Sequence, residues 1–168
     1  MSEIFEKGYF FNPTKGNLKK EEVLDEVLNY FRAKPERKYE IVVGCDSSDR
    51  EAHFFVVVVI LRKGEGGRFF AKKIDYSRTF HSLKERVLQE VLISCELATE
   101  LREEIKQRVA KEIPHLDYQF EYIHADIGTN GPTKEMIKEI VNLIKGNGFL
   151  PKIKPESFAA SVVADRFC

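Results

Sequence analysis

Three aspartates lie beside or within apolar segments. Burying a charged carboxylate there costs free energy unless something compensates its charge. Asp46 closes the strand-like run 41–46, and Asp126 closes a second strand-like run at 118–126. Asp165 lies in the last segment, four residues after Ser161 and seven after Phe158, so helical spacing predicts that it shares the face turned toward the sheet. Two neighbouring strand ends and a helix can direct all three carboxylates to one point.

Crowded carboxylates repel one another unless a cation neutralises them or one of them keeps its proton. Hard oxygen ligands with room for water suit Mg²⁺ or Mn²⁺. Two such ions can activate a water molecule and stabilise the leaving oxygen of a phosphodiester. The pattern therefore favours metal-dependent chemistry on a phosphate ester.

Each aspartate also has an ordinary interpretation. A lone aspartate at a strand end commonly shapes a turn or caps a helix, and Asp46 precedes the turn-prone residues 47–49. Asp126 precedes a loop rich in Gly and Asn, and Asp165 could pair with a basic side chain. Their joint occurrence in one order of elements favours the metal site over these separate explanations.

Hydrophobic spacing predicts the element order βββαβαβα after an N-terminal helix. The helix is expected to begin at Asn17 as its cap and to end at Pro35. The expected strands are 39–46, 53–62, 68–76, 118–126 and 149–154. The expected helices are one capped by Ser82 and Glu85, one from Pro132 to Gly146, and a short one from about residue 157.

This order predicts an α/β fold in which helices cover a five-stranded mixed sheet. The strand 53–62 is apolar on both faces and should be interior, whereas Pro151 places its strand at an edge. We expect residues 1–37 to form an N-terminal extension with an accessory helix, and residues 38–168 to form the domain.

Four stretches carry a resemblance to a known family: VVGCDSS, SLKERVLQEVLISCELATEL, HADIGTNGPTKEMIKEIV and GNGFLPKIKPESFAASVVADRF. Over residues 38–168 the chain resembles the ribonuclease-H-like superfamily, and within it the YkuK-like family of small bacterial proteins predicted to be nucleases. The resemblance implies an RNase H-like fold with strand order 3-2-1-4-5. It also implies an Asp on the first strand, a Glu on the first long helix, an Asp at the end of the fourth strand and an Asp or His on the last helix.

Asp46, Asp126 and Asp165 match three of these four positions. Glu85, Glu90 and Glu96 compete for the helical position. Glu90 lies beside the apolar stripe of the helix, whereas Glu85 is better explained as a capping residue and Glu96 points outward. We therefore predict Glu90.

The resemblance implies a nuclease with Asp46, Glu90, Asp126 and Asp165 as catalytic metal ligands for Mg²⁺ or Mn²⁺, acting on RNA or DNA. A non-catalytic nucleic-acid-binding or assembly module on the same fold is the main alternative. A nucleotide enzyme of the actin-like branch ranks last, because such enzymes need two sheet domains.

Other polar residues are weaker candidates. Ser47 and Ser48 are expected to shape a turn, and His124 to make a structural hydrogen bond. Asn130 is first a turn residue, although it could contact substrate. Candidate phosphate contacts are Lys72, Lys73, Arg78, Lys152 and Lys154. The sequence shows no aromatic array typical of a base-stacking platform.

Composition narrows the function classes. The 27 basic and 27 acidic side chains balance, which argues against a basic, non-specific nucleic-acid coat. The three cysteines, Cys45, Cys95 and Cys168, are too widely spaced to predict a zinc cluster or a disulfide framework. No membrane-length apolar run and no secretion signal are visible, so we expect a cytoplasmic protein; the oligomeric state is not indicated.

Overall fold

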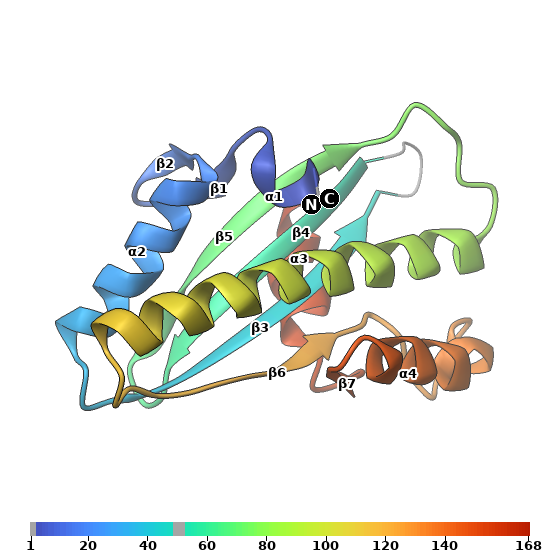
Figure 1. The fold of residues 1–168 in the computed structure, drawn as a ribbon. Helices are drawn as coiled ribbons and strands as arrows, with labels where there is room; N and C mark the ends of the chain where they lie inside the picture. Colours follow the sequence, from blue (N-terminus) through green and yellow to red (C-terminus); the bar gives the residue numbers. More distant parts are fainter. Residues whose placement is uncertain (1–2, 49–52) are drawn as a thin grey trace.

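A twisted mixed sheet forms the centre of the protein in our computed structural model, which describes residues 3–48 and 53–168 (Figure 1). The seven strands lie in the order β2-β1-β5-β4-β3-β6-β7. They are β1 (Phe10–Asn12), β2 (Gly16–Leu18), β3 (Lys38–Ser47), β4 (His53–Arg62), β5 (Gly66–Asp75), β6 (Asp117–His124) and β7 (Leu150–Lys152). The strands β3, β4 and β5 are antiparallel neighbours, whereas β6 runs parallel to β3 and β7 parallel to β6.

The predicted α/β fold, its mixed sheet and the order of the five main strands are confirmed. In chain order, β3 to β7 follow the pattern 3-2-1-4-5, with β4 in the interior and β7, which contains Pro151, at the edge. The sheet gains two further strands, because the hairpin β1–β2 adds to the free edge of β5 through the pair Phe11↔Ala71. Of the turn-prone residues 47–49, Ser47 is the last residue of β3 rather than part of a turn, and residue 49 lies outside the described part of the chain.

The predicted start of the N-terminal helix is wrong. Asn17 lies in β2, and α2 (Lys20–Ala33) begins after Lys19, whose backbone N–H donates to the Glu22 carboxylate at 3.0 Å. Gly16 has a φ of +75°, which permits the hairpin turn before β2. Asn17 is therefore used in strand pairing with Phe11 rather than in capping.

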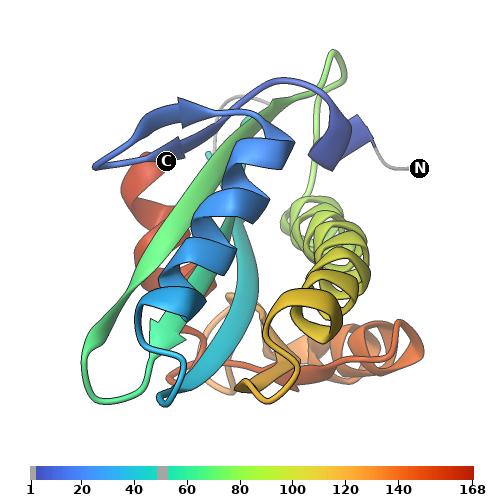
Figure 2. The ribbon, with the colours of Figure 1, turned by 60° about the vertical axis from the view of Figure 1, so that its left-hand side comes forward.

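Helices cover both faces of the sheet (Figure 2). One face carries α1 (Glu3–Glu6), α2, α3 (Leu83–Glu112) and α4 (Ile137–Gly146), and a short 3₁₀ turn, η1 (Lys134–Met136), precedes α4. The other face is covered by the C-terminal segment, which consists of η2 (Ala159–Val163) and η3 (Ala164–Phe167). Phe10, Val23 and Phe31 of the N-terminal part share the main core with Ile41 and Val43, and the boundary between residues 37 and 38 stays a prediction.

The capping residues of α3 are those that the sequence predicts. Ser82 Oγ accepts a hydrogen bond from the Glu85 backbone N–H at 3.1 Å. The Glu85 carboxylate in turn accepts from the His81 backbone N–H at 2.9 Å. This engagement at the N-terminus of α3 removes Glu85 from the competition for the carboxylate site.

The last segment is not the regular α-helix that the sequence predicts. η2 is a π-helical turn and η3 is a 3₁₀ turn, so the 3.6-residue period does not apply across them. As a result Asp165 and Val162 are exposed instead of lying in a stripe buried against the sheet.

Gly44 on β3 allows the C-terminal segment to approach the sheet closely. A Cβ atom on Gly44 would lie 2.6 Å from the backbone nitrogen of Ala160 and 2.8 Å from the carbonyl carbon of Ala159. The space beside Gly44 is thus filled by the backbone of η2, which brings the residues that follow η2 over the end of β3.

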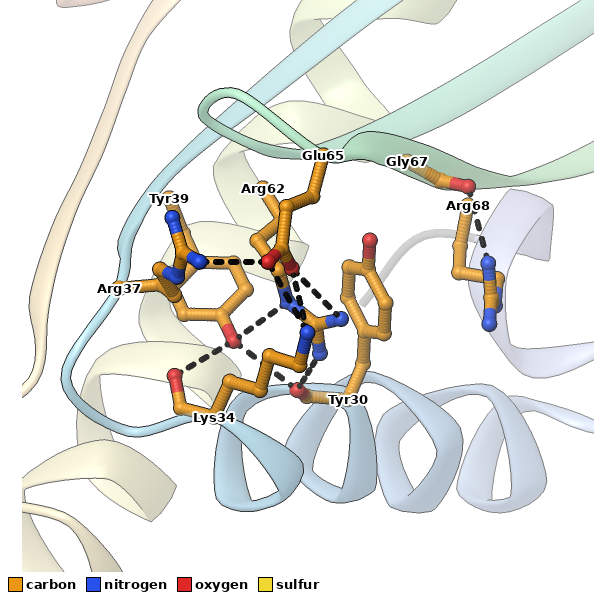
Figure 3. Close-up of polar contacts among 8 residues, drawn as sticks. All are labelled: Tyr30, Lys34, Arg37, Tyr39, Arg62, Glu65, Gly67 and Arg68. Atoms are coloured by element: carbon orange, nitrogen blue, oxygen red, sulfur yellow. Dashed lines mark hydrogen bonds and ion pairs between the residues drawn. The ribbon is translucent and has the colours of Figure 1, made fainter.

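A cluster of polar side chains around Arg62 fixes α2 to the end of the sheet where β3 begins and β4 ends (Figure 3). The Arg62 guanidinium donates to Tyr39 Oη at 3.0 Å and to the Tyr30 carbonyl at 2.7 Å, and it lies 3.9 Å from the centre of the Tyr30 ring. Glu65 pairs with Lys34 and Arg37 at the rim of this cluster. The cluster stabilises the scaffold at a distance from the carboxylates.

Within the described residues, no helix has both the length and the apolar character needed to cross a membrane.

We predict that Gly44→Ala lowers the free energy of unfolding by about 2 kcal/mol, because the new methyl group overlaps backbone atoms that have little freedom to move. Gly146→Ala is the matched control, since no atom lies within 4 Å of its Cβ position. Urea denaturation of both variants measures the difference. Equal stability of the two variants would contradict the close contact between β3 and η2.

Candidate carboxylate site

The site lies at the carboxyl ends of two neighbouring parallel strands, β3 and β6. Their register pairs Gly44 with His124. Asp46 and Asp126 each follow this pair by two residues, so both carboxylates emerge at the carboxyl ends of neighbouring parallel strands. The carboxyl ends of parallel strands are the common location of ligand sites in α/β folds.

Asp46 is the most crowded of the aspartates. Its side chain lies against the C-terminal segment, only 8% of the residue is exposed, and its carboxyl group is hydrogen-bonded to that of Asp165. Burial and this hydrogen bond raise the pKa of Asp46 to about 7, and the negative charges of Asp126 and Asp165 act in the same direction. Asp46 therefore keeps its proton to a higher pH than an isolated aspartate, which relieves the repulsion.

Glu90 reaches the same region from α3 on the opposite face of the sheet. It is 6% exposed, and Ser47 Oγ donates to Glu90 Oε2 at 2.6 Å. Burial raises the pKa of Glu90 to about 8, assisted by the charges of Asp46 and Asp126 and opposed by the Ser47 hydrogen bond. Of the three competing glutamates, Glu90 is the one that the structure places beside Asp46 and Asp126.

Asp126 lies just beyond the end of β6, because the strand stops at His124. Ser161 Oγ donates to Asp126 Oδ1 at 3.1 Å, and Lys154 Nζ lies 3.0 Å from the same oxygen. The carboxylate of Asp126 is therefore held by the C-terminal segment and by the loop after β7.

One cavity of about 210 Å³ joins three of these four carboxylates. Its lining includes Asp46, Glu90 and Asp126 together with Ser47, Arg86, Asn130 and Lys154. Asp165 does not line the cavity and meets the cluster through Asp46. Arg86 and Ser161 were missed as site residues, although Arg86 lies one helical turn before Glu90 and Ser161 one turn before Asp165.

His124 has the structural role that the sequence predicts. It is buried, and its Nδ1 accepts a hydrogen bond from the Ala159 backbone N–H at 3.0 Å. Burial and the nearby charge of Lys152 lower the pKa of His124 to about 4, so the ring is neutral near pH 7. This neutral ring fixes the start of η2 against β6.

The side chains predicted to contact phosphate have different surroundings in the structure. Lys154 reaches the cavity, whereas Lys72 is buried and donates to the Lys7 carbonyl. Lys152 lies over the Tyr122 ring, and Arg78 pairs with Glu85 at 3.8 Å. Lys154 is thus the one lysine of the predicted set that lines the cavity with the carboxylates.

The donor set fits a hard divalent cation by type. It consists of carboxylate oxygens that line a cavity of about 210 Å³, which has room for an ion with several water molecules. As the side chains lie, no group of three or more His, Cys, Asp or Glu within residues 3–48 and 53–168 has the spacing of metal ligands. In this arrangement Ser47 contacts Glu90, and Ser161 and Lys154 contact Asp126.

We predict that the protein without added metal loses stability as the pH rises from 5 to 8. The pKa values of Asp46 and Glu90 are raised on folding, so the folded state binds more protons than the unfolded state in this range, and the slope of the unfolding free energy is negative. Relative to Glu90→Gln, the wild type should lose about 3 kcal/mol between pH 5 and 8.

Urea denaturation at several pH values measures this difference, with Asp117→Asn at the opposite end of β6 as the control that keeps the wild-type slope. A wild type that tracks Glu90→Gln at every pH would contradict the crowding of the carboxylates.

Comparison with known proteins places the chain among proteins of related sequence. A family model described as Ribonuclease H-like matches residues 22–168. The uncharacterized protein YkuK of Bacillus subtilis (strain 168) is 27% identical over 165 residues, which cover 94% of this chain and 95% of that protein.

A solved structure with partial similarity is the endonuclease V of Ciona intestinalis in complex with a 24mer DNA that contains an inosine followed by a ribo-adenosine. The match has 16% identity and a TM-score of 0.28, and it covers 62% of this chain. The chain spans about half of that endonuclease chain, 48% by the same match. A score this low carries no argument about activity.

Proposed function

Because this chain belongs to the ribonuclease H-like family, we propose that it is a divalent-metal-dependent nuclease that hydrolyses phosphodiester bonds of RNA or DNA. One observation carries the proposal: Asp46, Glu90 and Asp126 come from distant parts of the chain and line one cavity. Asp165 joins them through its hydrogen bond to Asp46. Turn formation alone would not require carboxylates from distant parts of the chain to gather at one cavity.

Asp46, Glu90, Asp126 and Asp165 are the residues that would hold Mg²⁺ or Mn²⁺. Such ions, when bound, would supply activation of a water molecule and neutralisation of charge on the phosphate. The water oxygen forms the new bond to phosphorus, the ester P–O bond breaks, and the leaving oxygen departs with a proton. No side chain acts as the nucleophile, and the carboxylates serve to bind and orient.

Polar residues on the cavity wall would position the substrate. Arg86, Asn130 and Lys154 line the same cavity as the carboxylates and present donors to a phosphate. Lys154 is bound to Asp126 in the structure, at 3.0 Å. We infer that Lys154 exchanges this carboxylate for a substrate phosphate when a cation takes its place.

We predict cleavage of labelled RNA or DNA oligonucleotides that requires Mg²⁺ or Mn²⁺ and that falls by about 100-fold or more in Asp46→Asn. Gel analysis of labelled products measures the activity, and circular dichroism verifies the fold of the variant. Asp117→Asn removes a carboxylate from the other end of β6 and should keep full activity. Cleavage by Asp46→Asn at the wild-type rate would disprove the assignment.

A second prediction separates ion binding from substrate binding. Lys154→Gln frees Asp126 from its ion pair, so Mn²⁺ affinity should be equal to or about 3-fold higher than that of the wild type. The cleavage rate at saturating Mn²⁺ should fall by about 10-fold, because a phosphate contact is lost. Titration calorimetry and the oligonucleotide assay measure the two quantities, and a parallel loss of both would contradict this role.

A non-catalytic nucleic-acid-binding module is the second candidate. It is favoured by the lack of metal-ligand spacing among the acidic side chains of the described residues and by the engagement of Asp126 by Lys154. This function predicts binding that chelators leave unchanged, together with no cleavage under any metal condition. The oligonucleotide assay therefore distinguishes the two candidates directly.

A further inference from the structure

A group of partly exposed aromatic rings, which we term the aromatic strip, lies on the sheet face that carries the C-terminal segment. The strip consists of Phe11, Phe55, Phe69 and Phe167. The Phe167 ring lies 5.9 Å from that of Phe55 in a stacked arrangement, 6.0 Å from that of Phe69 and 6.2 Å from that of Phe11. Phe11 is 40% exposed, and Tyr9, two residues earlier in the chain and just before β1, adds a second exposed ring (56%) next to the strip in the sequence.

The aromatic strip begins beside the carboxylates. Asp46 on β3 pairs directly with Phe55 on β4, and Phe55 pairs with Lys73 on β5. Directly paired residues of antiparallel strands project from the same face of the sheet. A single row across the sheet therefore leads from a carboxylate to an aromatic ring and then to a lysine.

The C-terminal segment joins the two regions. Asp165, which is hydrogen-bonded to Asp46, precedes Phe167 by two residues. The same short segment thus supplies one acidic group to the cluster and the central ring to the aromatic strip.

An accessible lysine lies beside the strip. The side chain of Lys73 is 49% exposed, and its Nζ lies 3.9 Å from Asp75 Oδ1. Asp75 also contacts His53 Nδ1, so this carboxylate is shared and the Lys73 ammonium still faces solvent. Neighbouring strands lie about 4.8 Å apart, so Lys73 is about 10 Å from Asp46 along the row, or about three stacked nucleotides at 3.4 Å each.

We propose that the aromatic strip binds a single-stranded stretch of nucleic acid, with bases stacked on its exposed rings and a phosphate at Lys73. Aromatic rings interleaved with positive charge are the composition of single-strand platforms, because every unpaired base offers a face for stacking. A duplex keeps its bases stacked inside and gains nothing from these rings. The proposal rests on the proposed function, since it names the form of nucleic acid that this site receives.

The test is equilibrium binding of a fluorescein-labelled 12-nucleotide single strand, as RNA and as DNA, and of the matching duplex, measured by anisotropy in EDTA. Tyr9→Ala and Phe11→Ala should each weaken single-strand binding by about 10-fold and leave duplex binding unchanged. Lys73→Gln should reduce the slope of the salt dependence by about one. Leu92→Ala is the matched control, because Leu92 is an exposed apolar residue (45%) on α3 at the opposite face.

The outcomes separate this proposal from the nuclease. Single-strand binding that depends on Tyr9 and Phe11 supports the strip even if no metal condition gives cleavage. Unchanged single-strand binding in both variants overturns the strip even if cleavage occurs and is lost in Asp46→Asn. Loss of self-association in Phe11→Ala with unchanged strand binding would assign the strip to a contact between two copies of the chain, which also overturns the proposal.

Discussion

The contact between the backbone of η2 and Gly44 is the constraint on which the candidate site depends. β3 and β6 bring Asp46 and Asp126 together through their parallel register alone. Asp165 and Ser161 reach this edge only because Gly44 has no side chain and lets the backbone at Ala159 and Ala160 lie against β3. The His124 hydrogen bond to the Ala159 N–H fixes the same contact from β6.

Bringing these carboxylates together creates electrostatic repulsion, which neighbouring groups reduce. Asp46 has a raised pKa and so keeps its proton more readily, Glu90 accepts from Ser47, and Asp126 is paired with Lys154. Each device is reversible, since a proton, a hydroxyl hydrogen bond and a half-exposed lysine can all be exchanged for a cation. A carboxylate cluster that served stability alone would gain from replacement by neutral side chains, because removal of buried like charges relieves repulsion. The cost is understandable if the site has to bind positive charge.

Much of the fold follows from local patterns that the sequence expresses strongly. The two-faced apolar run of β4, the Ser82–Glu85 cap and Pro151 at the edge each reflect a single physical rule, and all three are found in the structure. Asn17 fails because a capping residue is also acceptable in a short strand, and the Gly16 turn allows the hairpin instead. Which strand such a hairpin joins depends on the free edge of β5, which local sequence does not reveal.

Some residues of the candidate site could likewise be predicted from the sequence, and others could not. Asp46 and Asp126 could be predicted to lie together, since each follows an apolar strand, and Glu90 could be chosen over Glu85 once the cap was recognised. Asp165 reaches the cluster for a different reason from the one the spacing suggests. Its segment forms a π turn and a 3₁₀ turn, so the helical stripe does not exist and the side chain approaches Asp46 from a solvent-exposed position.

The aromatic strip was invisible in the sequence for the same reason that it is informative in the structure. Its rings come from an N-terminal hairpin, two central strands and the last turn, so no window of the sequence contains more than two of them. Only the register between β3, β4 and β5 aligns Phe55 and Lys73 with Asp46. Because η3 carries both Asp165 and Phe167, any shift of this segment alters the carboxylate cluster and the strip together.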